Sequence, residues 1–248
     1  MPELDLLLPL VLILGLAGLV QGLSGFGAGL LAIPLLALFL PLATVVPLMN
    51  LLGLVIALIN LPHIAHALRL QPILTLLLGY GLGAPLGLWV LSHAPAGPVL
   101  GILGLWLCAY ALFALWGHGW ENAWLREQRL ALGAAAGALG TGFGTSGPPV
   151  ILHVAAQRDW TCDQQKATLV LFFLISGAMT VLTHALGGLL TPDVLGWLPW
   201  GLPSLVLGTW TGIALYRNLG KHQYQRLTFG LILVSGLALG LRALLGGS

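Results

Sequence analysis

Long apolar runs set the basic organisation of the sequence. Six of them approach or exceed about 20 residues, the length of helix that crosses the hydrocarbon core of a bilayer. These runs are 44–67, 73–92, 98–117, 167–190, 198–216 and 227–245. The pattern predicts six membrane-spanning helices.

Two further regions, 6–40 and 130–157, each hold two shorter apolar pieces separated by a glycine-rich segment. Such short pieces are typical of re-entrant or broken helices. Glycine at this density permits a non-helical backbone, and Pro148 suits the first turn of a new helix. We therefore expect a helical hairpin in each region. The pieces are 6–20 and 28–40 around residues 21–27, and 130–139 and 148–157 around residues 140–147.

The composition excludes several classes of protein. Nine Lys and Arg and seven Asp and Glu make up 6% of the 248 residues, and 58% of the chain is apolar. An ordinary soluble domain carries about 25% charged residues. The chain is therefore not a soluble enzyme, a disordered protein or a nucleic-acid binder, and we expect an all-α polytopic membrane protein. Cys108 and Cys162 are the only thiols and lie far apart in sequence, so we expect no disulfide, no metal site and no cofactor.

The two glycine-rich regions reveal an internal repeat. Ser24-Gly25-Phe26-Gly27 aligns with Thr141-Gly142-Phe143-Gly144, and the pair Gly83 and Gly87 aligns with Gly208 and Gly212. The same features follow in the same order in both halves, which indicates a tandem duplication. The expected organisation is a first repeat at 1–117, a linker at 118–129 and a second repeat at 130–248. The paired glycines within the spans are expected to serve close helix packing.

The positive charges predict the topology. If each glycine-rich region is a hairpin that enters and leaves on one side, each half crosses the membrane an odd number of times and the second half is inverted. Eight basic residues then share one side, and only Arg242 lies on the other. Those eight are Arg69, Arg126, Arg129, Arg158, Lys166, Arg217, Lys221 and Arg226. By the positive-inside rule the linker is cytoplasmic and both termini lie outside.

The glycine-rich turns are the candidate binding site. In the inverted arrangement their tips meet near the midplane, and half-helices begin at Ala28 and Pro148. Unpaired N–H groups at such helix starts favour anions, and nearby hydroxyl groups add donors. The candidate substrate-binding residues are Ser24, Gly25, Phe26, Gly27, Asn50, Thr141, Gly142, Phe143, Gly144, Thr145 and Ser146. The amides near Gly25, Gly27, Gly142 and Gly144 are the expected backbone donors. The alternative is that these turns serve only close packing.

Other polar residues constrain the kind of ligand. All seven acidic residues fall in predicted tails or loops, which argues against a cation site or a carboxylate proton relay. Each of the histidines His63, His66, His153 and His184 either titrates and couples a proton to the anion or serves a structural role. Asn50 lies inside a span, where its amide either contributes to the site or bonds to another helix.

One motif raises an enzymatic alternative. Gly22-Leu23-Ser24-Gly25 has the form found in intramembrane serine proteases, and Gly144-Thr145-Ser146-Gly147 repeats it. A protease needs one serine activated by one histidine, whereas here the motif is duplicated with the repeat and lacks a matching histidine. We therefore expect no enzyme, and an intramembrane serine hydrolase remains a remote alternative.

The ordered set of motifs resembles a known family. The Gly-Phe-Gly turn before a stretch that reaches Pro34, its second copy at 141–149, and the late paired glycines of each half are similar to the sulfite exporter TauE/SafE family of permeases. The resemblance covers residues 10–244, with Ala28-Gly29 in place of a richer glycine run. It implies a bacterial inner-membrane permease for small anions such as sulfite, sulfonates or related organic acids, with both turns lining the pathway.

The leading hypothesis is therefore a secondary transporter of a small anion, and a passive anion channel of the same fold is the alternative. The expected partners are the anionic substrate and the lipid bilayer. Coupled protons and a homodimer stay open, and no nucleic acid is expected.

Overall fold

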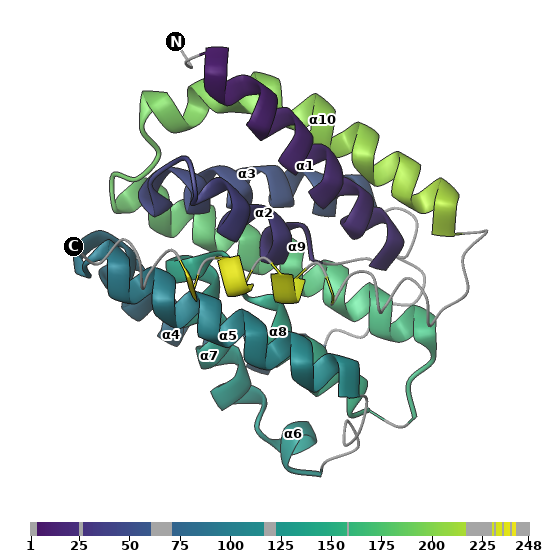
Figure 1. Ribbon diagram of the computed structural model, residues 1–248. Coiled ribbons are helices and arrows are strands. Elements are labelled where there is room, and N and C mark those ends of the chain that lie inside the picture. The colour runs from purple at the N-terminus through teal and green to yellow at the C-terminus, as the bar shows by residue number, and fades with distance from the viewer. Residues whose placement is uncertain are drawn as a thin grey trace. The chain divides into compact units, whose positions relative to one another are not determined.

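The computed structural model of the chain is helical throughout the part that it describes (Figure 1). The described residues are 4–24, 27–60, 71–116, 123–157, 159–216, 230, 232–234, 236–238 and 240–241. The helices are α1 Leu4–Ser24, α2 Ala28–Leu36, α3 Leu42–Asn60, α4 Gln71–His93, α5 Ala96–Trp116, α6 Ala123–Glu127, α7 Arg129–Phe143, α8 Gly147–Ala155, α9 Cys162–Leu186 and α10 Pro192–Tyr216. The all-α class is confirmed for these residues.

The expected spans coincide with long helices. The runs 73–92 and 198–216 lie inside α4 and α10, while 98–117, 44–67 and 167–190 overlap α5, α3 and α9. The end of the run 44–67, together with His63 and His66, lies outside the described residues. The run 227–245 is described only in short helical pieces between 230 and 241.

The first glycine-rich region differs from the prediction. Helix α1 continues to Ser24 and is 21 residues long, so the expected short piece at 6–20 is wrong. Residues 6–23 are one of three stretches, with 73–93 and 167–186, that are long and apolar enough to cross a membrane, among the described residues. The same correction applies to α7, which continues to Phe143 instead of ending near residue 139. The break between α7 and α8 is therefore only three residues long.

Helices α1 and α7 continue through their glycines because the glycine backbone packs directly against the backbone of a neighbouring helix. The chain divides into two compact units: residues 1–52, 93–117 and 190–248, and residues 53–92 and 118–189. In the first unit α1 packs along α10, where a Cβ on Gly18 or Gly22 would collide with α10 backbone (Figure 1). A Cβ on Gly208 or Gly212 would likewise collide with α1 backbone.

The second unit repeats this packing with the counterpart helices. A Cβ on Gly83 would meet the Ala134 carbonyl, and one on Gly87 would meet the Ala138 carbonyl. The packing role expected for both glycine pairs is therefore confirmed. The packed pairs are α1 with α10 in the first unit and α7 with α4 in the second. Each compact unit thus combines segments from both halves of the chain.

Another face of α4 carries large apolar side chains that the described part of the chain covers only partly. Leu74, Leu78, Leu82, Leu86 and Trp89 recur at helical spacing and are all more than half exposed. A continuous apolar stripe of this kind would be unfavourable in water and is typical of a surface that faces lipid. Helix α4 therefore has one glycine face for packing and one leucine face for the bilayer.

The glycine contact predicts a selective loss of stability. Gly83→Ala should lower thermal stability by about 1–3 kcal/mol, because the new Cβ overlaps backbone that no rotamer change can move. Gly53→Ala is the matched control, since a Cβ there meets nothing within 4 Å and alanine is the better helix former. The melting temperatures of both purified variants are measured by heating samples and monitoring the loss of the folded peak in size-exclusion chromatography. Equal melting temperatures would contradict this packing.

Candidate anion-binding site

The turn after α1 contains a glycine in the left-handed region. Gly27 has φ 102°, a conformation that costs a residue with a Cβ about 1–2 kcal/mol. Helix α2 then begins at Ala28 as expected, and the Ala28 N–H donates to Oε1 of Gln21 over 3.1 Å. One amide at this helix start is therefore already satisfied, by a residue that the sequence analysis did not single out. Gly25, Phe26 and the side chain of Ser24 lie outside the described residues.

The turn after α7 has the corresponding geometry. Gly144, the residue aligned with Gly27, has φ 64°. Its N–H donates to the Gly140 carbonyl over 2.9 Å, and the Thr145 N–H donates to the Leu139 carbonyl over 3.2 Å. These bonds satisfy carbonyls at the end of α7. The Gly144 amide is thus committed to the helix cap, and Gly142 lies within the helix itself, so neither amide is the free donor that the sequence predicted.

The second half-helix offers few backbone donors. Helix α8 begins at Gly147, next to the expected start at Pro148, with Ser146 as its N-cap residue. Pro148 and Pro149 lack N–H groups, so Gly147 supplies the only amide among the first three helical residues. The charge of the helix terminus remains favourable for an anion. Side-chain hydroxyls must nevertheless supply most of the hydrogen bonds.

Three buried polar atoms around this turn have no hydrogen-bond partner among the described residues. They are Oγ1 of Thr141, Oγ1 of Thr145 and Nδ1 of His184. The exposed fractions of these side chains are 0%, 2% and 0%. Leaving a buried polar group unpaired costs about 1–3 kcal/mol, and such groups in native proteins commonly mark a bound water, ion or ligand. Helix α7, the turn and helix α9 each contribute one of the three.

A hydrogen bond fixes the orientation of the histidine. His184 Nε2 lies 2.9 Å from the Thr141 carbonyl oxygen. Because a carbonyl oxygen only accepts, Nε2 carries the hydrogen, and neutral His184 has its lone pair on Nδ1. The unpartnered group is therefore an acceptor, whereas the two unpartnered threonine hydroxyls can donate.

A tyrosine from α4 completes the polar cluster. The Tyr80 hydroxyl lies 2.5 Å from Oγ1 of Thr180, which itself donates to the Ser176 carbonyl over 2.9 Å. Tyr80 is therefore the donor to Thr180, and its oxygen keeps free lone pairs. Thr141 lies close to the same hydroxyl, but its Oγ1 makes no hydrogen bond of ordinary geometry to it. Gly140 leaves room for the Tyr80 ring at this position, because a Cβ on residue 140 would meet both the Tyr80 hydroxyl and the Cβ of Ser146.

Sequence reasoning missed Tyr80, Ser176 and Thr180. The available signal was the spacing of Ser176, Thr180 and His184, which are four residues apart and share one face of an otherwise apolar helix. On this face His184 bonds to the Thr141 carbonyl of α7, and Thr180 bonds to Tyr80 of α4. The edge-to-face contact of Tyr80 with Phe172, whose ring centroids are 5.8 Å apart, holds the tyrosine ring in place.

The remaining candidates have other partners. Asn50 belongs to the first unit, and its Nδ2 donates to the Val46 carbonyl of its own helix over 2.9 Å. Phe143 is buried at the end of α7. Both ring nitrogens of His153 have partners, with Nδ1 2.7 Å from the Leu125 carbonyl and Nε2 3.3 Å from Gln157. His153 thus links α8 to α6 and is a structural histidine.

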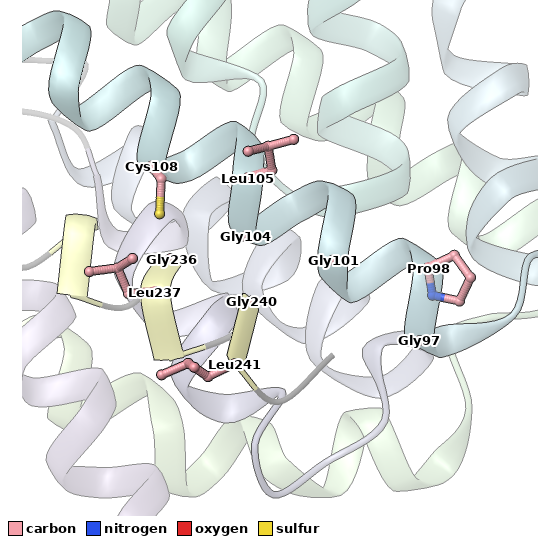
Figure 2. A pocket seen from close by; sticks show the side chains of 10 residues that line it. All are labelled: Gly97, Pro98, Gly101, Gly104, Leu105, Cys108, Gly236, Leu237, Gly240 and Leu241. Carbon is pink, nitrogen blue, oxygen red and sulfur yellow. The ribbon is translucent and has the colours of Figure 1, made fainter. Parts of the chain in front are cut away.

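A separate cavity of about 860 Å³ lies in the first unit between α5 and the helical pieces at 236–241 (Figure 2). Its lining is glycine and leucine with Pro98, and its one side-chain heteroatom is the sulfur of Cys108. Such a lining has no strong donor for an anion and includes none of the predicted site residues. The cavity therefore does not compete with the polar cluster of the second unit as an anion site.

Comparison with known proteins adds one finding. The family model described as Sulfite exporter TauE/SafE matches residues 10–239, which is most of the chain. Comparisons with curated proteins and with solved structures gave no match.

The left-handed glycine at the second turn predicts a conformational cost that can be measured. Gly144→Ala should destabilise the protein by about 1–2 kcal/mol, whereas Gly144→Asn should cost less because asparagine tolerates this region. Gly147→Ala is the control, since it lies three residues away without positive φ and its Cβ would make only ordinary contacts. Thermal unfolding in detergent compares the three. A larger loss for Gly147→Ala would be inconsistent with the turn geometry.

Proposed function

We propose, from the premise that this chain belongs to the sulfite exporter TauE/SafE family, that it is a secondary transporter of a small oxyanion that binds at the turn between α7 and α8. Family membership and the apolar helices together make it a membrane-embedded protein of a transporter family. The observation that carries the proposal is the set of three buried, unpartnered polar atoms at that turn.

The chemistry of these groups suits an oxyanion of the sulfite, sulfonate or carboxylate type. The Thr141 and Thr145 hydroxyls and the Gly147 amide are donors, and the start of α8 adds partial positive charge. The expectation that all acidic residues lie in tails or loops is wrong for Asp5, Glu127, Asp163 and Asp193, which lie in the terminal turns of α1, α6, α9 and α10. No carboxylate among the described residues lies deep in a helix, so none is expected to repel the anion. We propose that the corresponding turn around Gly27 also lines the pathway, since it begins an equally short helix after the aligned glycine.

Uptake into proteoliposomes tests the function. The assay should present labelled sulfite, methanesulfonate, taurine and acetate, each with and without an imposed pH gradient. Protein-free liposomes serve as the blank, because protonated weak acids cross lipid unaided. Transport of an oxyanion with accumulation against its gradient supports the transporter. Transport that only dissipates gradients would indicate a channel, and absence of transport for the whole panel would contradict the proposal.

The hydroxyl donors predict a specific loss of affinity. Thr145→Val and Ser146→Ala should each weaken the apparent affinity about 10- to 150-fold, because a hydrogen bond to a charged group contributes about 1.5–3 kcal/mol. Thr168→Val is the matched control, since this threonine is equally buried but its hydroxyl already donates to the Gln164 carbonyl. Transport titrations at equal expression measure the effect. Wild-type affinity and rate in both site variants would place the site elsewhere.

We also propose the inverted topology, with both termini outside and the linker 118–129 in the cytoplasm. The eight-to-one distribution of basic residues supports it. In a background without Cys108 and Cys162, single cysteines at Glu121 and Asp193 should react with a membrane-impermeant reagent from opposite sides. Labelling of both positions from the outside would refute the inverted arrangement.

A further inference from the structure

We infer that His184 carries the proton that moves with the anion, and that the second unit therefore binds an oxyanion together with one proton. This inference rests on the proposed function and names its coupling group. The cluster that carries it comprises Tyr80, Thr141, Thr145, Thr180 and His184. Tyr80, Thr180 and His184 are not among the predicted substrate-binding residues.

Nδ1 of His184 is a hydrogen-bond acceptor without a partner among the described residues. Donation from Nε2 to the Thr141 carbonyl fixes the tautomer of neutral His184, so that the lone pair on Nδ1 has no partner in a fully buried environment. A histidine retained only for structure would use both nitrogens, as His153 does in the same unit. The free nitrogen is the position at which an imidazole takes up a proton.

The hydroxyl groups near His184 are complementary to an oxyanion. Thr141 and Thr145 add two unpartnered hydroxyls around the same turn, and both can donate to an oxyanion. An oxyanion that moves together with one proton needs a protein group that holds the proton and several donors for the oxygens of the anion. The cluster supplies this combination, because the proton lies on Nδ1 and the hydroxyls donate to the oxygens.

Other charged groups do not supply this proton. Helices α4, α7 and α8 pack against α9. Their described titratable or charged side chains are Tyr80 and His93 on α4, Arg129 on α7 and His153 on α8. The Tyr80 hydrogen is committed to Thr180, His93 is exposed at the end of α4, and Arg129 and His153 lie near each other at the far end of α7 from Thr141.

The proton step is balanced without any further reactant. Nδ1 of neutral His184 takes a proton from a hydronium ion, so that an O–H bond breaks, an N–H bond forms and a water molecule leaves. The new N–H donates to the anion. After the site opens to the other side, the anion leaves and the N–H bond breaks as the proton returns to water as hydronium, so one proton crosses with each negative charge.

The test separates coupling from binding. Proteoliposomes with wild-type protein are assayed with labelled sulfite and methanesulfonate, first for exchange at equal pH and then for accumulation driven by an imposed pH gradient. One proton for each monovalent anion predicts about tenfold accumulation for a gradient of about one pH unit. His184→Gln keeps a donor near the position of Nε2 for the Thr141 carbonyl but cannot take up a proton. It should retain exchange and lose the driven accumulation.

His153→Gln is the matched control, because that histidine is buried in the same unit but has both nitrogens occupied. It should retain exchange and accumulation, and loss of accumulation in both variants would overturn the specific role of His184. Driven accumulation by His184→Gln at the wild-type level would also overturn it. If His184→Gln does not fold, His184→Asn decides by the same criteria.

The wild-type assays separate the two proposals. Exchange without any accumulation driven by pH would overturn the inference and leave an uncoupled carrier. Absence of both activities would contradict the transporter itself, and the inference would fall with it.

Discussion

Inside a bilayer every backbone N–H and C=O group has to find its partner within the protein, and this constraint shapes the whole chain. It explains why the described residues are mostly helical and why the break after α7 is so short. At the second break, Gly144 and Thr145 immediately return their N–H groups to carbonyls of α7. The chain can therefore interrupt a helix without leaving these amides unpaired.

The same constraint makes the unpaired side chains of the second unit informative. The Gly144 and Thr145 amides at the turn are satisfied, yet two threonine hydroxyls and one imidazole nitrogen are not. In an apolar interior each of these atoms lowers stability unless a ligand or water bonds to it. Elsewhere in the same unit, threonines such as Thr168 and Thr183 donate to carbonyls of their own helix. The contrast distinguishes polar residues that serve the fold from those that suit a ligand.

The sequence predicted the helical class, most long helices and the equivalence of the two turns, because apolar length and glycine spacing are local signals. Gly27 and Gly144 were aligned from sequence, and both have positive φ. The end of α1 was not predictable in the same way. Gly22 belongs to the segment 21–27 in which a break was expected, but it packs against α10, so tertiary contact overrides the low helix propensity of glycine.

The site was predicted only in part for a similar reason. Thr141 and Thr145 were proposed from sequence because they lie beside the turn, whereas Tyr80 and Thr180 come from helices distant in sequence and are brought to Thr141 by packing. The expected donor role of the Gly144 amide depended on cap geometry, which residue types alone do not specify. Residue spacing on α9 held the missing information, since Ser176, Thr180 and His184 share one face.

Location of a bound oxyanion is the most direct test of this account. Selenite is a close analogue of sulfite, and its selenium can be located by anomalous scattering in crystals of the full-length protein. The account predicts a selenium peak within hydrogen-bonding reach of the Thr141 and Thr145 hydroxyls and of His184 Nδ1. Selenite bound at another place, with only water at these three atoms, would contradict it.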